Sequence, residues 1–202
     1  LYAGWHGGPF FAQLSAGYGW TSYDFQREIT IGDILATQSS RWSGTILSGD
    51  AVVGARFALG RFSIEPSNSL SYTRLRQGGY AMSGGGELDL AVDGRTDKAL
   101  LENVRLAIGY DVPLGEEQAI GFNLRGGYSL QLDRSVSALS AQFLAGGSRF
   151  DMTSARLGGS SVQAGAGLSF RTPGFLVSLA GDRREESGYS DTAFTLTARL
   201  AF

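Results

Sequence analysis

Residues 191–202 alternate between apolar and polar side chains with a period of two. The apolar positions are, in order, Phe194, Leu196, Ala198, Leu200 and Phe202. Between them stand Thr195, Thr197, Arg199 and Ala201. A period of two indicates a β-strand with one apolar and one polar face. Such an apolar face could point into a soluble core or out into lipid, and this strand alone does not distinguish the two.

The same alternation recurs along most of the chain. Across residues 10–202 it predicts eight long strands, and residues 1–6 predict a short strand before them. In the first long strand, for example, Leu14 stands on the apolar face and Gln13 on the polar one. Pro66 falls inside a predicted strand and predicts a bulge or bend, because proline cannot donate to the ladder. The sequence therefore predicts an all-β, antiparallel architecture.

Composition is compatible with either a soluble or a membrane β-protein. The chain has 202 residues, of which 43% are hydrophobic, and we expect residues 1–202 to form a single domain. The mean hydropathy is -0.04, and no apolar run approaches the roughly 20 residues of a membrane-spanning helix. A transmembrane β-barrel hides its apolar half in alternation, so average hydropathy barely registers it.

Several function classes are disfavoured by composition. A net charge of -2 gives no reason to expect a nucleic-acid partner, and the absence of cysteine excludes disulfides and thiolate metal sites. His6 is the single histidine, so a catalytic triad or a histidine metal site is not expected. No G-x-G-x-x-G opens a helix. Lys98 is the single lysine, although soluble β-proteins commonly use lysine to protect exposed edges. We therefore expect no catalytic residues, no cofactor and no metal.

The predicted connections alternate between short and long. The short ones are residues 7–9, 59–61, 113–117 and 172–174, and the long ones are residues 27–41, 77–99, 133–160 and 182–190. Outer-membrane barrels have this rhythm, with short periplasmic turns and long extracellular loops. We expect residues 77–99 to hold a small hairpin of their own. The pattern predicts an up-and-down transmembrane β-barrel with about eight or nine strands in this chain, and this odd, unclosed set indicates that the chain is cut from something longer.

The polar face of the predicted strands is built mostly from small residues with isolated charges. Aromatic side chains recur near both strand ends, where interfacial girdles are expected. Four charged residues are predicted to line the lumen: Glu65, Arg105, Arg125 and Asp50. They could grip a segment inside the pore or line its path, or they could pair with one another to satisfy charge. Both interpretations remain open at this point.

Several segments, taken in order, resemble the autotransporter translocator domain. These are residues 60–66 with Leu70-Ser71-Tyr72, residues 143–147, residues 164–168 and the ending Leu200-Ala201-Phe202. The resemblance implies a twelve-stranded barrel at the C-terminus of a secreted protein, with a pore helix joining it to an exported passenger. Implied partners are outer-membrane lipid, the protein's own passenger and linker helix, and the barrel-assembly machinery. By the same resemblance, Leu200 and Phe202 form the signal that this machinery reads.

Three functional hypotheses follow. The leading one is an outer-membrane translocator that anchors in the membrane and mediates surface export of an N-terminal passenger, with its short turns and C-terminus in the periplasm. The alternative is a small complete outer-membrane barrel whose extracellular loops act in adhesion or ligand binding. A third, an outer-membrane enzyme, needs a nucleophile and a base that the sequence does not identify. The coding region upstream of Leu1 distinguishes the first two hypotheses.

Overall fold

The computed structural model describes residues 1–32, 34–153 and 159–200. The main sheet is built, in spatial order, from β1 (Tyr2–Gly7), β2 (Phe10–Ile31), β3 (Ile34–Ala55), β5 (Phe62–Gln77), β8 (Arg95–Pro113), β9 (Ala119–Ser135), β12 (Ser160–Thr172), β13 (Phe175–Glu186) and β14 (Tyr189–Leu200). Shorter elements are β4 (Phe57–Leu59), β6 (Tyr80–Ala81), the 3-10 turn η1 (Gly86–Leu88), β7 (Leu90–Val92), β10 (Leu139–Phe143) and β11 (Phe150–Met152). None of the helical segments in these ranges is long and apolar enough to cross a membrane.

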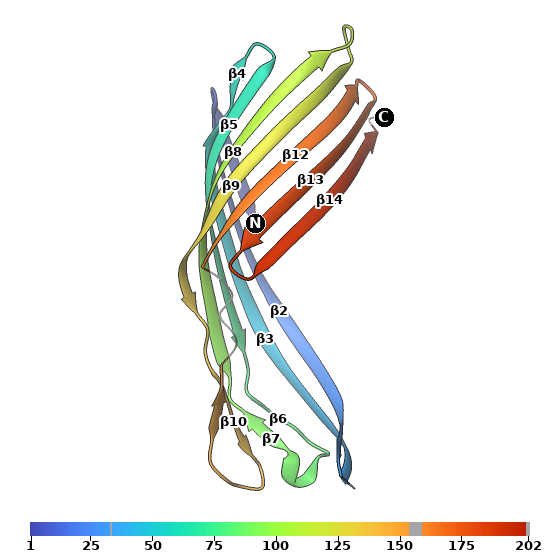
Figure 1. Ribbon diagram of the computed structural model, residues 1–202. Coiled ribbons are helices and arrows are strands. Elements are labelled where there is room, and N and C mark those ends of the chain that lie inside the picture. The colour runs from blue at the N-terminus through green and yellow to red at the C-terminus, as the bar shows by residue number, and fades with distance from the viewer. Residues whose placement is uncertain (33, 154–158, 201–202) are drawn as a thin grey trace.

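The main sheet is an antiparallel meander that curls into half a barrel. Each of its strands pairs with the next one in the order above, which confirms the predicted up-and-down topology. The short turns gather at one end, the upper end in Figure 1, and β2 and β3 run far beyond β12 to β14 at the other. In the described part of the chain, β1 and β14 each pair on one side only, so the sheet has two free edges.

One face of this sheet is apolar and exposed. Leu14, Leu124 and Leu196 are 60%, 63% and 73% exposed. The register keeps such residues on one face, because Leu168 lies opposite both Phe122 and Leu179. Burying a large apolar side chain stabilises a protein by about 1.5–3 kcal/mol, so a whole exposed face is costly in water. The apolar side chains therefore do not form a protein interior, and the face requires an apolar medium.

The opposite, polar face is crowded, which identifies it as the concave one. A Cβ atom added at Gly109 would lie 2.4 Å from Ser63 Oγ, and one added at Gly167 would lie 2.7 Å from Asn123 Nδ2. On the apolar face, a Cβ atom added at Gly126 would meet nothing closer than 4.0 Å. Side chains converge on the inside of a curled sheet and diverge on its outside. Small residues on the polar face thus permit the curvature.

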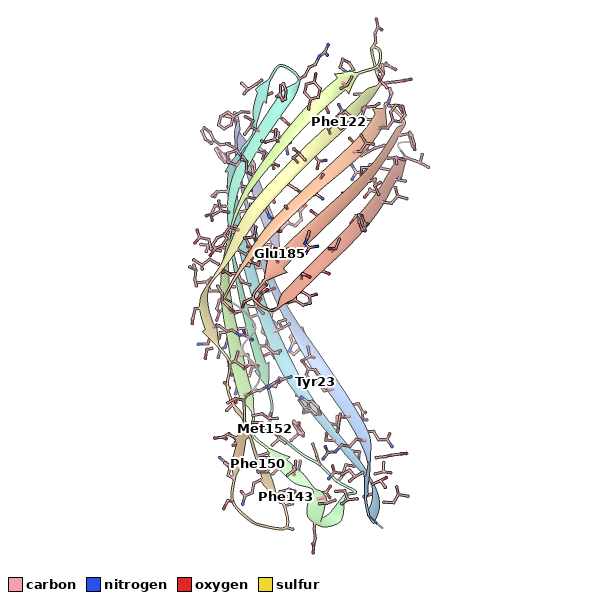
Figure 2. The ribbon with its side chains drawn as sticks, in the orientation of Figure 1. Tyr23, Phe122, Phe143, Phe150, Met152 and Glu185 are labelled. Carbon is pink, nitrogen blue, oxygen red and sulfur yellow. The ribbon has the colours of Figure 1, made fainter. Side chains whose placement is uncertain are left out.

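A second sheet, in the order β11-β10-β7-β6, lies at the end away from the short turns. It is joined to β3 by a bridge between Ser39 and Ser83. Figure 2 shows Phe143, Phe150 and Met152 in this region. The pairing of β6 with β7 confirms the small hairpin predicted within residues 77–99. The strands β10 and β11 fall in residues 133–160, which the sequence pattern predicted as a long connection.

The predicted polar connections at residues 27–41 and 182–190 are wrong. The strands β2 and β3 continue as one long hairpin through the first, and β13 and β14 extend through most of the second. These extensions carry polar residues on both faces, so their backbone pairing leaves no period-two signal in the sequence. Pro66 was expected to cause a bulge or a bend, and the bulge is absent, because the register between β5 and β8 is unbroken there. On the other side of β5 the pairing is interrupted across from Pro66, at Arg56 between β3 and β4.

Candidate functional site

The strongest polar contact on the concave face joins Arg125 of β9 to Asp182 of β13. Nε and Nη2 of Arg125 donate to the two carboxylate oxygens at 2.6 and 2.5 Å, and Nη1 donates to Asn123 Oδ1 at 3.0 Å. The strand between them, β12, places Gly165 opposite both residues. The absence of a side chain at Gly165 leaves room for the two partners to meet across β12. The result is a two-pronged ion pair that bridges three strands.

Arg105 faces the same hollow from β8. This hollow is lined by Arg105, Arg125, Gln163, Asp182 and Asp191 together with neighbouring residues of β9, β13 and β14. Arg105 is exposed, and in the described ranges it makes no hydrogen bond or ion pair with another residue. Its guanidinium is therefore available to an acidic group entering the hollow.

The two predicted acids lie elsewhere on the same face. Glu65 of β5 pairs with Arg56, whose Nε donates to Oε2 at 2.5 Å. Asp50 of β3 accepts a hydrogen bond from Ser15 Oγ at 3.1 Å. The structure thus brings Arg105 and Arg125 together and leaves Glu65 and Asp50 with separate partners. Among the residues that the structure describes, no hydrogen bond or ion pair joins one of these four residues directly to another.

A ladder of neutral polar groups crosses the concave face beside the ion pair. Asn103 Nδ2 donates to Ser69 Oγ at 3.3 Å, and Ser129 Oγ donates to Asn103 Oδ1 at 2.5 Å. Gln163 Nε2 then donates to Ser129 Oγ at 3.3 Å. These contacts link β5, β8, β9 and β12. These strands of the barrel wall are therefore held together by hydrogen bonds between neutral side chains.

Sequence reasoning missed Asp182 as a partner of Arg125. It assigned Asp182 to a loop, because the charged run that follows interrupts the apolar pattern. The alternation of Ser178, Ala180 and Asp182 could have extended the strand by one more polar position. Arg56, the partner of Glu65, stands between the apolar residues Ala55 and Phe57, but the sequence alone could not pair it with Glu65 because that pairing depends on the register.

The long-loop end is organised by a buried glutamine. Gln38 is fully buried; its Oε1 accepts from Arg27 Nε at 2.8 Å, and its Nε2 donates to Leu88 O at 2.7 Å and to Asp89 Oδ1 at 3.0 Å. Four residues along β3, the ring of Trp42 stacks between those of Tyr23 and Tyr80, with centroids 5.1 and 4.1 Å away. Figure 2 marks Tyr23 on the long hairpin. These contacts fix the second sheet against the inner side of β2 and β3.

The remaining predicted positions lie at the ends of the sheet. Leu200 closes β14 opposite Phe175 and is exposed, whereas Phe202 lies outside the described residues. His6 stands on β1 near the ring of Phe11, at 6.1 Å between centroids. Within residues 1–32, 34–153 and 159–200 there is no group of three or more His, Asp or Glu side chains able to hold a metal ion.

Comparison with known proteins gives one clear match. The autotransporter beta-domain family matches residues 1–182. A comparison with curated proteins finds no match. The matched segment contains the whole concave polar face from β1 to Asp182.

Proposed function

Because the chain belongs to the autotransporter beta-domain family, we propose that it mediates export of its own N-terminal passenger to the cell surface. The chain is an outer-membrane β-barrel translocator domain of type V secretion. The observation that supports passenger export is the combination of a crowded polar concave face with an exposed apolar convex face. Family membership favours this function over that of a small barrel acting through its loops.

The orientation in the membrane follows from the two ends of the sheet. The short turns and the C-terminus face the periplasm, and the long hairpin of β2 and β3 with the second sheet faces outward. A transmembrane β-strand needs about 9–11 residues, and β2 and β3 have 22 each. The excess length projects beyond the bilayer on the side of the second sheet. Outer-membrane barrels place their longer connections outside the cell.

Residues 1–202 form part of a larger, twelve-stranded barrel. Support comes from the free edges of β1 and β14, whose backbone groups would be exposed to hydrocarbon. Each unpaired backbone group in a bilayer costs several kcal/mol, so both edges need partner strands. Further strands of the same protein close the wall by pairing with them.

The lumen charges guide the linker helix of the passenger. Arg105 contributes a free guanidinium, while the pairs of Arg125 with Asp182 and of Glu65 with Arg56 keep the wall in shape. Asp50 carries a second acidic group that makes only a neutral hydrogen bond. Arg105→Glu should slow the appearance of passenger at the surface. The same change at Arg61, in a short turn, is the matched control and should leave the rate unchanged.

Assembly depends on the end of the chain. Leu200 and Phe202 provide the apolar terminal pattern that the barrel-assembly machinery reads. The exposed side chain of Leu200 on the apolar face supports this assignment. Outer-membrane lipid then surrounds the apolar face.

The direct test of export uses the intact protein in a Gram-negative host. Protease added to whole cells should remove the passenger when residues 1–202 are present and leave it intact when they are deleted. A passenger that reaches the surface without these residues contradicts the proposal. A wild-type chain that fractionates as a detergent-free soluble protein contradicts it as well.

A further inference from the structure

Three cationic side chains gather on the convex face of β5 and β8. Arg74 and Arg76 stand on β5, and Lys98 stands on β8. Arg74 and Lys98 occupy directly opposed register positions, so both project from the same face. That face is the apolar one, because Leu70 and Tyr72 precede Arg74 at alternate positions of the same strand. All three cations are exposed, and in the described part of the chain none has a hydrogen-bond or ion-pair partner.

The acidic groups of this face do not neutralise the cluster. Glu102 is engaged by Asn68, whose Nδ2 donates to Oε1 at 2.8 Å. On the neighbouring long hairpin, Asp24 is already paired with Arg41 at 2.5 Å.

Asp133 lies on the same face, two positions along β9 from Ser135, which lies opposite Lys98. Asp133 and Glu102 thus supply two carboxylates to this face, and in the described part of the chain neither forms an ion pair with the three cations. Like charges directly opposite one another destabilise a sheet, so an anion bound between Arg74 and Lys98 would stabilise this pair.

Neighbouring aromatic rings indicate how deep in the membrane the three cations lie. Tyr72 lies two residues before Arg74 on β5. On β2, Tyr18 is separated from Arg74 by one residue of β3, and its ring contacts that of Trp20 edge-on at 5.1 Å. Tyrosine and tryptophan mark the interface between hydrocarbon and headgroups. In the register Arg74 lies level with Tyr18, and Arg76 lies level with Trp20, so the cations stand at the depth of these rings, where the headgroups begin.

We infer that Arg74, Arg76 and Lys98 bind the phosphate groups of an outer-leaflet glycolipid, the lipid A part of lipopolysaccharide. This inference rests on the proposed function, which turns this end of the barrel outward. Arginine binds phosphate through parallel hydrogen bonds, and lysine adds a compact positive charge. The acyl chains of the same lipid would cover Leu70 and the apolar positions beside it. The site holds a lipid against the outside of the barrel wall and is separate from the lumen.

The test uses the intact protein, purified and inserted into phosphatidylcholine vesicles that contain a small fraction of lipid A. Lipid A retained by the protein after extraction in mild detergent is counted by native mass spectrometry. Lipid A with both phosphates is compared with the same lipid lacking them. The wild-type protein should retain the phosphorylated form at least about tenfold more strongly, as expected for several basic groups acting on an anionic headgroup.

Variants locate the site. Arg74→Gln combined with Lys98→Gln should reduce retention of phosphorylated lipid A to the level of the dephosphorylated form. Arg61→Gln, at the opposite end of the barrel, should leave retention unchanged. If Arg61→Gln loses as much retention as the double variant, the assignment is wrong. It is also wrong if inorganic phosphate alone displaces lipid A.

The comparison of the two lipid A forms uses only the wild-type protein, so it tests the lipid site even where a substitution prevents folding. Equal retention of the two lipid A forms by an inserted wild-type protein overturns the lipid site and leaves the translocator function intact. Failure of the wild-type protein to insert into any vesicle overturns the proposed function itself.

Discussion

A methyl group added at Gly165 tests the crowding of the concave face. In Gly165→Ala the new Cβ would lie 2.3 Å from Asp182 Oδ1 and 2.9 Å from the backbone oxygen of Gly181. The backbone of β13 is held by its ladder, so the carboxylate must turn away from Arg125. The ion pair has side chains 36% and 45% exposed, and its loss costs about 1 kcal/mol after solvent screening. Overpacking adds about 1–3 kcal/mol.

We therefore expect Gly165→Ala to lower the free energy of unfolding by about 2–4 kcal/mol. The matched control is Gly126→Ala, one strand away on the convex face, where the added Cβ meets nothing closer than 4.0 Å. This control should change stability by less than about 1 kcal/mol, because it mainly restricts the unfolded chain. Urea unfolding of the barrel in lipid vesicles, followed by tryptophan fluorescence, measures both variants. Equal destabilisation by the two substitutions would refute the assignment of the concave face.

Three further predictions concern the ion pair, the lipid-facing wall and the chain end. Arg125→Gln and Asp182→Asn should each destabilise the barrel by about 1 kcal/mol, and the double variant should cost less than the sum in the same unfolding assay. Leu124→Arg should cost about 2–4 kcal/mol, whereas Thr197→Arg, at an exposed position of the concave face, should cost much less; equal costs would contradict the two-faced wall. Phe202→Ser should reduce membrane insertion, seen as loss of the heat-modifiable band on gels, and a normal band in that variant would count against a terminal assembly signal.

The membrane-spanning part of the fold was predictable because its strands separate apolar from polar residues. The alternation of Phe122, Leu124 and Asn123 fixed the faces of β9, and the short turns fixed the direction of the chain. Resemblance of the ordered motifs predicted the family that matches residues 1–182. Here the physical constraint is strong, because a shift of one residue would turn every apolar side chain to the wrong face.

The loop end was less predictable because its stability comes from specific pairings. Gln38 is buried by contacts with Arg27, Leu88 and Asp89, which come from three separate segments of the chain. Nothing in the local sequence around Gln38 indicates that an amide is buried there. The partner of Arg125 was missed for a similar reason, since the two residues are 57 positions apart and meet only through the register of β12.

The central claim is that the exposed apolar face of the sheet contacts lipid and the polar face contacts water. The domain has no cysteine, so single cysteines can be placed at successive positions of β9 and labelled with a spin probe. Collision with oxygen, which partitions into lipid, and with a water-soluble nickel complex then reports the surroundings of each site in vesicles. Our account predicts lipid contact at Phe122 and Leu124 and water contact at Asn123 and Arg125. A reversed alternation, or none at all, would contradict it.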